Sequence, residues 1–172
     1  EYLPAALKRV SGNYLSRKLF KRKRDYEFIA TAVEGSEHRM DEKFIKYFSK
    51  RPECSLVFKT ADNAEGGFFN MGDVYIYPTK MEGIGLTITE AMCSGMPVVT
   101  SDFPTMNEWF ADGEAGRLIQ PAKIKETIMM PKQVIPSSKH LAGIMEDYIK
   151  KPDQIEEQSV IAREIVEKRY NW

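Results

Sequence analysis

The sequence predicts an α/β fold in which short parallel strands form a sheet flanked by helices. Short apolar runs rich in β-branched and aromatic residues, at 55–58, 73–78 and 97–100, indicate buried strands. Segments with apolar residues at intervals of three and four lie between and after these runs and indicate helices. Strands that alternate with helices favour a parallel sheet covered on both faces. With 172 residues, of which 42% are hydrophobic, the chain is expected to form a single domain.

The first third of the chain is the hardest to assign. Residues 1–12 fit a leader or linker, and a short helix over residues 2–10 fits as well. Residues 14–15 are assigned to a first strand. Apolar residues between 26 and 33 follow a helical stripe, and those between 44 and 48 indicate a second short helix.

The middle of the chain alternates strand and helix more clearly. The strand at 73–78 is stopped by Pro78, and a helix over residues 87–94 follows, with Gly95 as its C-terminal stop. Residues 116–119 predict a further strand.

The last third combines a surface loop with two helices. Residues 121–137 are irregular in pattern and are expected to form the loop. Ser137 or Ser138 can cap a helix that Pro152 ends, and residues 154–170 predict a final amphipathic helix. The order of elements is typical of the Rossmann-like α/β class.

Composition excludes several classes of function. Lys plus Arg and Asp plus Glu both total 25, so the net charge is zero and no global attraction to nucleic acid is expected. The cysteines and histidines, Cys54, Cys93, His38 and His140, lie at no metal-ligand spacing, and no metal site is expected. No apolar run reaches the roughly 18 residues that cross a bilayer, and the first ten residues lack the apolar core of a signal peptide. A cytoplasmic location is therefore expected.

Residues 77–99 carry the clearest chemical signal, as a strand, loop, helix, tight turn and strand. Ligands of open parallel sheets bind beyond the carboxyl ends of the strands, where this loop begins. Gly83 and Gly85 would let a ligand approach the backbone closely. The start of the following helix offers unpaired N–H groups and a positive dipole end, which suit a phosphate.

Two glutamates, Glu82 and Glu90, bracket this predicted anion seat. A carboxylate accepts hydrogen bonds from two vicinal hydroxyls, so the pair suits a molecule with a sugar at one end of a diphosphate and a ribose at the other. The alternative is a capped helix with one glutamate on its solvated face and no ligand.

The run Glu82-Gly-Ile-Gly-Leu-Thr-Ile-Thr-Glu90-Ala-Met-Cys-Ser-Gly95-Met-Pro97 resembles the E-x7-E signature of family-4 retaining glycosyltransferases and their GT-B relatives. The departures are chiefly Ile84, where the family has Phe, and Thr87, where it often has Pro. The preceding strand and the downstream Asp112-Gly113 also resemble the family's motifs, and the similarity extends from about residue 25 to the end of the chain. It implies that the fold is one half of a GT-B fold, namely the donor-binding C-terminal domain.

The resemblance implies specific roles at the donor site. Glu82 is expected to contact the hydroxyls of the donor sugar and to be important for catalysis, and Glu90 to hold the ribose. The backbone and side chains expected near the sugar and diphosphate belong to Gly83, Ile84, Gly85, Leu86 and Thr87.

The resemblance also implies an arginine and a lysine that neutralise the leaving nucleoside diphosphate. Six cations between residues 17 and 24 are the expected source. Alignment of the apolar stripe places Arg24 at the family's lysine, whereas a motif-based alignment selects Lys23. Arg17 fits the first-strand arginine, and the other cations are expected to coat a loop.

The implied activity is transfer of a sugar from a nucleoside-diphosphate sugar to a glycan, lipid or other acceptor, without a metal or other cofactor. GT-B enzymes bind the acceptor in an N-terminal domain, which this chain is expected to lack, so the isolated domain is expected to bind donor weakly, if at all, and to be inactive. Any peripheral membrane association would come through that missing half, and no nucleic acid is an expected partner. The alternatives are a non-catalytic sugar-nucleotide-binding or interaction domain, a GT-B epimerase and a glycogen-synthase-type domain.

Overall fold

The computed structural model describes residues 5–9, 26–33, 54–59, 69, 72–126 and 132–170. By their contacts, the residues divide into two compact units, Leu3–Asp73 and Val74–Trp172, the second of which also includes Glu1–Tyr2. Within the described ranges, no helix is long and apolar enough to cross a membrane.

The first unit contains three described strands, β1 (Ala5–Arg9), β2 (Tyr26–Val33) and β3 (Cys54–Lys59). β2 lies between the other two strands. It pairs antiparallel with β1, where Ala5 lies opposite Ala30, and parallel with β3. The strand predicted at 55–58 is thereby confirmed as β3.

Two predictions for this unit are wrong. Residues 26–33 form β2 and not a helix, because eight residues are too few for periodicity to separate a helix from a buried strand. These residues form a strand because their backbone pairs with β1 on one side and with β3 on the other. The leader or short helix expected at the start of the chain contains β1, because non-local pairing with β2 overrides the weak local preference of its five residues.

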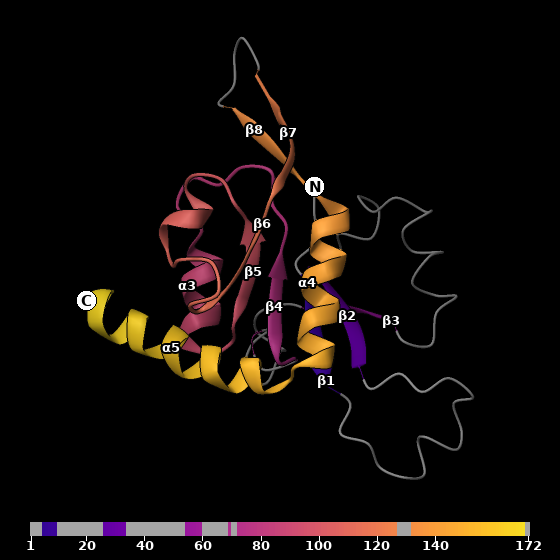
Figure 1. The fold of residues 1–172 in the computed structure, drawn as a ribbon, viewed down its shortest axis with the longest axis vertical. Coiled ribbons are helices and arrows are strands. Elements are labelled where there is room, and N and C mark those ends of the chain that lie inside the picture. The colour runs from indigo at the N-terminus through magenta and orange to yellow at the C-terminus, as the bar shows by residue number, and fades with distance from the viewer. Residues whose placement is uncertain are drawn as a thin grey trace. The chain divides into compact units, whose positions relative to one another are not determined.

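The second unit is built on three parallel strands, β4 (Val74–Tyr77), β5 (Val98–Ser101) and β6 (Gly116–Ile119). They are adjacent in that order, and their carboxyl ends point the same way (Figure 1). All three coincide with predicted strands. The largest side chains of the strands that are fully buried are aliphatic, namely Ile76, Ile119, Val74, Val98 and Val99.

Helix α3 (Leu86–Cys93) connects β4 to β5, as predicted. It packs against β5 and against the last helix, α5 (Asp153–Arg169). Gly95 has a φ of 72° just after α3, and its N–H donates to the carbonyl of Met92 at 3.0 Å. This left-handed residue ends the helix in the way that the sequence predicts.

Helix α4 (Ser138–Lys150) packs against β6. Its N-cap is Ser137, whose side-chain oxygen accepts a hydrogen bond from the N–H of His140 at 3.2 Å. In Figure 1, α3 lies to the left of the three strands and α4 to their right. This arrangement confirms the predicted class, a parallel sheet flanked by helices.

The predicted surface loop at 121–137 is not irregular throughout. It contains the antiparallel strands β7 (Pro121–Lys125) and β8 (Gln133–Pro136), which project beyond the sheet in Figure 1. Cross-strand pairing forms this hairpin although the residues of β7 are all exposed, and the short alternation of Ala122 and Ile124 with two lysines is too weak a local signal to predict it.

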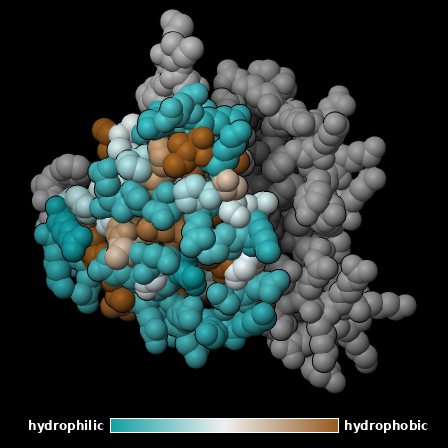
Figure 2. All heavy atoms as spheres, turned by 45° about the horizontal axis from the view of Figure 1, so that its top comes forward, coloured by the Kyte–Doolittle hydropathy of each residue, from teal (hydrophilic) through white to brown (hydrophobic). Residues whose placement is uncertain are grey.

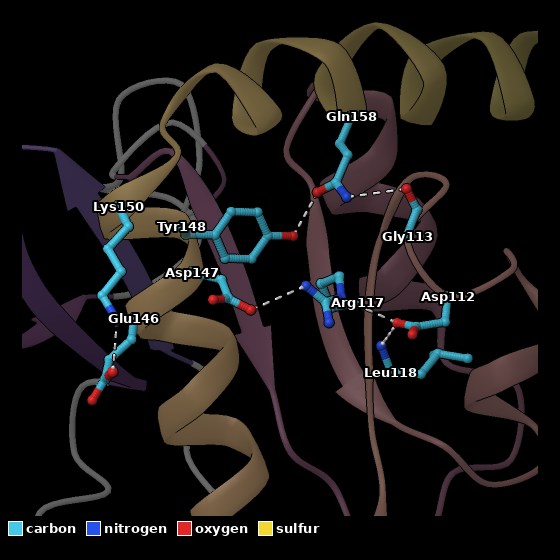
Figure 3. Close-up of polar contacts among 9 residues, drawn as sticks. All are labelled: Asp112, Gly113, Arg117, Leu118, Glu146, Asp147, Tyr148, Lys150 and Gln158. Carbon is cyan, nitrogen blue, oxygen red and sulfur yellow. Dashed lines mark hydrogen bonds and ion pairs between the residues drawn. The ribbon is translucent and has the colours of Figure 1, made fainter.

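A polar network joins α4, α5 and the turn before β6 (Figure 3). The carboxylate of Asp112 accepts hydrogen bonds from the N–H of Leu118 at 2.8 Å and from Nε of Arg117 at 3.3 Å. The buried Tyr148 hydroxyl donates to Gln158 at 2.6 Å, and Gln158 donates to the carbonyl of Gly113 at 3.2 Å. The Asp112-Gly113 turn therefore binds α5 directly through Gln158, and α4 indirectly through the bond of Tyr148 to Gln158.

We expect Gly116→Ala to destabilise the chain by about 3 kcal/mol, near the upper end of the range for overpacking. A Cβ at this position would lie 1.9 Å from the carbonyl oxygen of Val98 on the neighbouring strand. Urea unfolding measures the change.

The matched control is Gly143→Ala in α4, where nothing lies within 4 Å of the added Cβ. It should stabilise the chain by about 0.5–1 kcal/mol, because alanine is the better helix former. Equal free energies of unfolding for the two variants would contradict the close approach of β5 and β6.

Candidate functional site

The β4–α3 loop (residues 78–85) lies at the carboxyl edge of the parallel strands. Two buried hydroxyls at the end of β5 bind its start. Thr100 Oγ1 donates to the carbonyl of Tyr77 at 3.0 Å, and Ser101 Oγ donates to the carbonyl of Thr79 at 2.6 Å. The loop's entry is therefore set by the neighbouring strand and not only by its own sequence.

The carboxylate of Glu82 is held by hydroxyl groups from the same segment. The hydroxyl of Tyr77 donates to Glu82 Oε1, and Thr79 Oγ1 shares its one proton between the carbonyl of Met81 at 3.1 Å and the same Glu82 oxygen at 3.4 Å. Among the residues that the structure describes, Glu82 Oε2 receives no hydrogen bond. One carboxylate oxygen is thus oriented by the protein, and no described residue occupies the other.

Burial raises the pKa of Tyr77 to about 12, and the hydrogen bond to Glu82 and its negative charge add to the rise. Burial also raises the pKa of Tyr75, whose ring stacks on that of Tyr77 with centroids 5.6 Å apart. Phenols are protonated at neutral pH, and the raised pKa extends the range over which Tyr77 stays a hydrogen-bond donor to Glu82 into alkaline pH.

Gly85 forms the junction between the loop and α3. Its φ of 81° and ψ of 42° are left-handed, and it occupies the N-cap position, so no side chain caps the helix. A Cβ here would lie 3.1 Å from Ile88 Cδ1 and 3.3 Å from Trp109 Nε1. The first-turn amides of α3 thus have no side-chain cap, and a ligand could accept hydrogen bonds from them.

Thr87 lies in the first turn of α3 beside the two tyrosines. Its Oγ1 is buried and has no hydrogen bond of ordinary geometry, yet its hydroxyl is near enough to those of Tyr75 and Tyr77 to lower the pKa of each. These lowering effects are smaller than the effect of burial. The hydroxyl of Thr87 therefore lies near those of Tyr75 and Tyr77, and Tyr77 in turn donates to Glu82.

Glu90 lies further along α3, with its side chain exposed. The charges of Glu90 and of Glu82 both raise the pKa of Tyr75, so the two carboxylates act on the same tyrosine. The structure thus brings the predicted pair to one neighbourhood.

Apolar side chains are exposed at the same junction. Ile84 and Leu86, on either side of Gly85, are 60% and 53% exposed. Figure 2, in which the top of Figure 1 comes forward, shows apolar atoms reaching the surface among hydrophilic ones. Gly83 is also exposed, so the loop presents backbone and apolar surface to solvent.

Three predicted site residues, Arg17, Lys23 and Arg24, lie outside the described residues, as do the strand predicted at 14–15 and the helix predicted at 44–48. Sequence reasoning missed the supporting side chains of the loop, which are Tyr77, Thr79, Thr100, Ser101, Trp109 and Thr105, whose Oγ1 donates to the carbonyl of Glu82 at 3.4 Å. A threonine and a serine that end an otherwise apolar strand were the available signal, because buried hydroxyls need partners. No group of three or more His, Cys, Asp and Glu residues suited to a metal occurs in the part of the chain that the structure describes.

The family model of glycosyl transferases group 1 matches residues 16–156, and the chain belongs to this family. The capsular polysaccharide biosynthesis glycosyltransferase CapM of Staphylococcus aureus is 26% identical over 90 residues, which cover 52% of this chain and 23% of CapM. A sucrose synthase of Denitrovibrio acetiphilus is 33% identical over 99 residues, which cover 58% of this chain and 11% of the synthase. The chain therefore spans less than a quarter of the length of either relative.

Solved structures share the fold. The C-terminal domain of a glycosyl transferase group 1 family protein (LpcC) from Francisella tularensis matches with a TM-score of 0.58 and 21% identity, covering 76% of this chain and 60% of that one. Anabaena Alr3699/HepE, solved in complex with UDP-glucose, matches with a TM-score of 0.60 and 19% identity, covering 82% of this chain and 36% of that one. At this level of identity, the likeness supports the fold alone.

We expect Glu82→Gln to lower the pKa of Tyr77 below about 12, because it removes the negative charge beside the phenol. The ¹³Cζ shift of labelled tyrosine, followed by NMR against pH, measures the change. Since the folded pKa is raised from 10.0, Tyr77 stabilises the fold below pH 10, and this contribution is lost as the pH rises from 10 to about 12.

The control for this titration is Glu90→Gln. The charge of Glu90 acts on Tyr75 and is not among the causes of the rise at Tyr77, so the pKa of Tyr77 should stay the same. An unchanged pKa of Tyr77 in Glu82→Gln would contradict the contact between the phenol and the carboxylate.

Proposed function

We propose that residues 1–172 form the donor-binding C-terminal domain of a family-4 retaining glycosyltransferase with a GT-B fold. The domain binds a nucleoside-diphosphate sugar, from which the complete enzyme transfers the sugar to a glycan, lipid or other acceptor. Membership of the glycosyl transferases group 1 family supports the reaction class. The observation that carries the proposal is a helix N-terminus without a side-chain cap that lies between Glu82 and Glu90, with Glu82 held by Tyr77.

Each part of this arrangement suits one part of the donor. Glu82 Oε2 can accept hydrogen bonds from sugar hydroxyls, and Glu90, exposed on α3, can accept them from a ribose. The amides between Gly83 and Thr87 can donate to the diphosphate, where the positive end of the helix dipole adds to the attraction. The UDP-glucose complex of Anabaena Alr3699/HepE makes a uridine nucleotide a reasonable first ligand to test.

The chemical step needs stabilisation of the leaving group. Cleavage of a sugar–diphosphate bond builds negative charge on the departing phosphate, and donors aimed at that charge bind the transition state more strongly than the ground state. The helix N-terminus supplies one such donor set. We assign the cationic part of the task to Arg17 and to Lys23 or Arg24, and no metal is required.

The acceptor site is assigned to another domain. The chain covers 23% of CapM and 36% of Anabaena Alr3699/HepE, which leaves room in such proteins for an N-terminal acceptor-binding domain. On this proposal, the isolated chain binds donor in the cytoplasm but does not transfer the sugar, and nucleic acid is not a partner.

The test is calorimetry of the chain against a panel of UDP-, GDP- and ADP-sugars. We expect one base to be preferred, and we expect both Glu82→Gln and Glu90→Gln to weaken binding by about tenfold or more, the cost of losing hydrogen bonds to a charged group. Failure of the chain to bind any sugar nucleotide would contradict the proposal.

A matched control is Glu146→Gln, an exposed glutamate on α4 that pairs only with Lys150 at 3.2 Å within the described residues. It should leave the affinity unchanged. In a protein that joins this chain to an acceptor domain, Glu82→Ala should abolish sugar transfer while the protein stays folded. Unchanged transfer would favour a non-catalytic sugar-nucleotide-binding domain.

A further inference from the structure

Trp109 is bound to the junction between the β4–α3 loop and α3. Its indole Nε1–H donates to the carbonyl of Ile84 at 3.0 Å. If residue 85 had a Cβ, that atom would lie 3.3 Å from the same nitrogen. The indole therefore packs closely against the backbone here because residue 85 is a glycine. One aromatic residue from the segment after β5 therefore contacts both residues of the Ile84–Gly85 peptide.

This contact has a direct effect on the direction of an amide. The peptide bond is planar and trans, so the carbonyl of Ile84 and the N–H of Gly85 point in opposite directions in one plane. When Trp109 holds the carbonyl, the N–H of Gly85 must point away from the indole. Gly85 has no Cβ to hinder rotation of this peptide, so its orientation depends on an external contact.

The indole is in turn supported from the end of the chain's last helix. The ring of Tyr170, the C-cap residue of α5, packs edge-on against Trp109 with centroids 4.7 Å apart and an interplanar angle of 63°. Tyr170 itself is fixed by a backbone hydrogen bond to Val166 at 2.9 Å. A continuous set of contacts therefore runs from the end of α5, through two aromatic rings, to the Ile84–Gly85 peptide.

We propose that Trp109 is a positioning residue that locks the Ile84–Gly85 peptide in one orientation, and that Tyr170 holds Trp109 in place. This inference rests on the proposed function in one respect, because the locked peptide belongs to the loop assigned to the donor. It adds that a contact at the end of α5 holds the Ile84–Gly85 peptide of that loop in its orientation. A displacement of Tyr170 releases the indole and frees the peptide to rotate.

The first test observes the peptide without any ligand. Relaxation dispersion of the ¹⁵N-labelled chain reports microsecond-to-millisecond exchange at the Gly85 amide. Trp109→Phe keeps a ring beside Tyr170 but removes the hydrogen-bond donor, and we expect it to introduce exchange at Gly85. Tyr170→Ala should do so more weakly, and Tyr170→Phe, which keeps the ring, should match the wild type.

The control is Val160→Ala, because Val160 lies on α5 with 60% of its surface exposed. It should leave the Gly85 amide unchanged. Wild-type relaxation at Gly85 in Trp109→Phe would overturn the lock. If Trp109→Phe does not fold, as judged by circular dichroism, the comparison of Tyr170→Ala with Tyr170→Phe decides by the same readout, and equal relaxation in these two variants would overturn the proposal.

The second test measures affinity for the sugar nucleotide that the wild type binds best. The Kd should rise about two- to tenfold in Trp109→Phe, the factor that corresponds to loss of one hydrogen bond. A rise in Kd without a change at the Gly85 amide would mean that the indole contacts the ligand, and would overturn the positioning role. If the wild type binds no sugar nucleotide, the proposed function fails, and the relaxation data alone decide whether the peptide is locked.

Discussion

The candidate site depends on two buried hydroxyl groups at the end of β5. Thr100 and Ser101 are fully buried, and they donate to the backbone carbonyls of Tyr77, the last residue of β4, and of Thr79, in the β4–α3 loop. A buried hydroxyl without a partner is costly, so these bonds fix where the loop leaves the sheet. The parallel pairing of β4 and β5 makes this possible, because it brings the carboxyl ends of both strands to the same edge.

Once its entry is fixed, the loop organises the rest of the site through short-range contacts. Tyr77 and Thr79 reach Glu82 from the same loop entry and occupy one of its oxygens. The phenol of Tyr77 is neutral at physiological pH, so it orients the carboxylate without adding a competing charge, and burial extends this neutral form to higher pH. The site thus combines one preorganised carboxylate with a helix N-terminus that no side chain caps.

The far side of the unit supports the same loop from a distance. The network of Asp112, Gln158 and Tyr148 fixes α4 and α5 against the turn before β6. At its other end, α5 places Tyr170 against Trp109, which holds the carbonyl of Ile84. Residues far from the loop in sequence, such as Trp109, 25 positions after Ile84, therefore share control of its geometry.

The sequence by itself determined the three parallel strands of the second unit, the helices α3, α4 and α5, and the positions of Glu82, Gly85 and Glu90, because periodicity, caps and glycines are local signals. Only the tertiary structure decided that residues 26–33 and 5–9 are strands and that residues 121–136 contain a hairpin, since each depends on pairing with a distant partner. The same holds for the support of the site. No local pattern predicts the hydrogen bond from Tyr77 to Glu82 or that from Trp109 to Ile84, because such contacts arise from the packing of β5, α3 and α5.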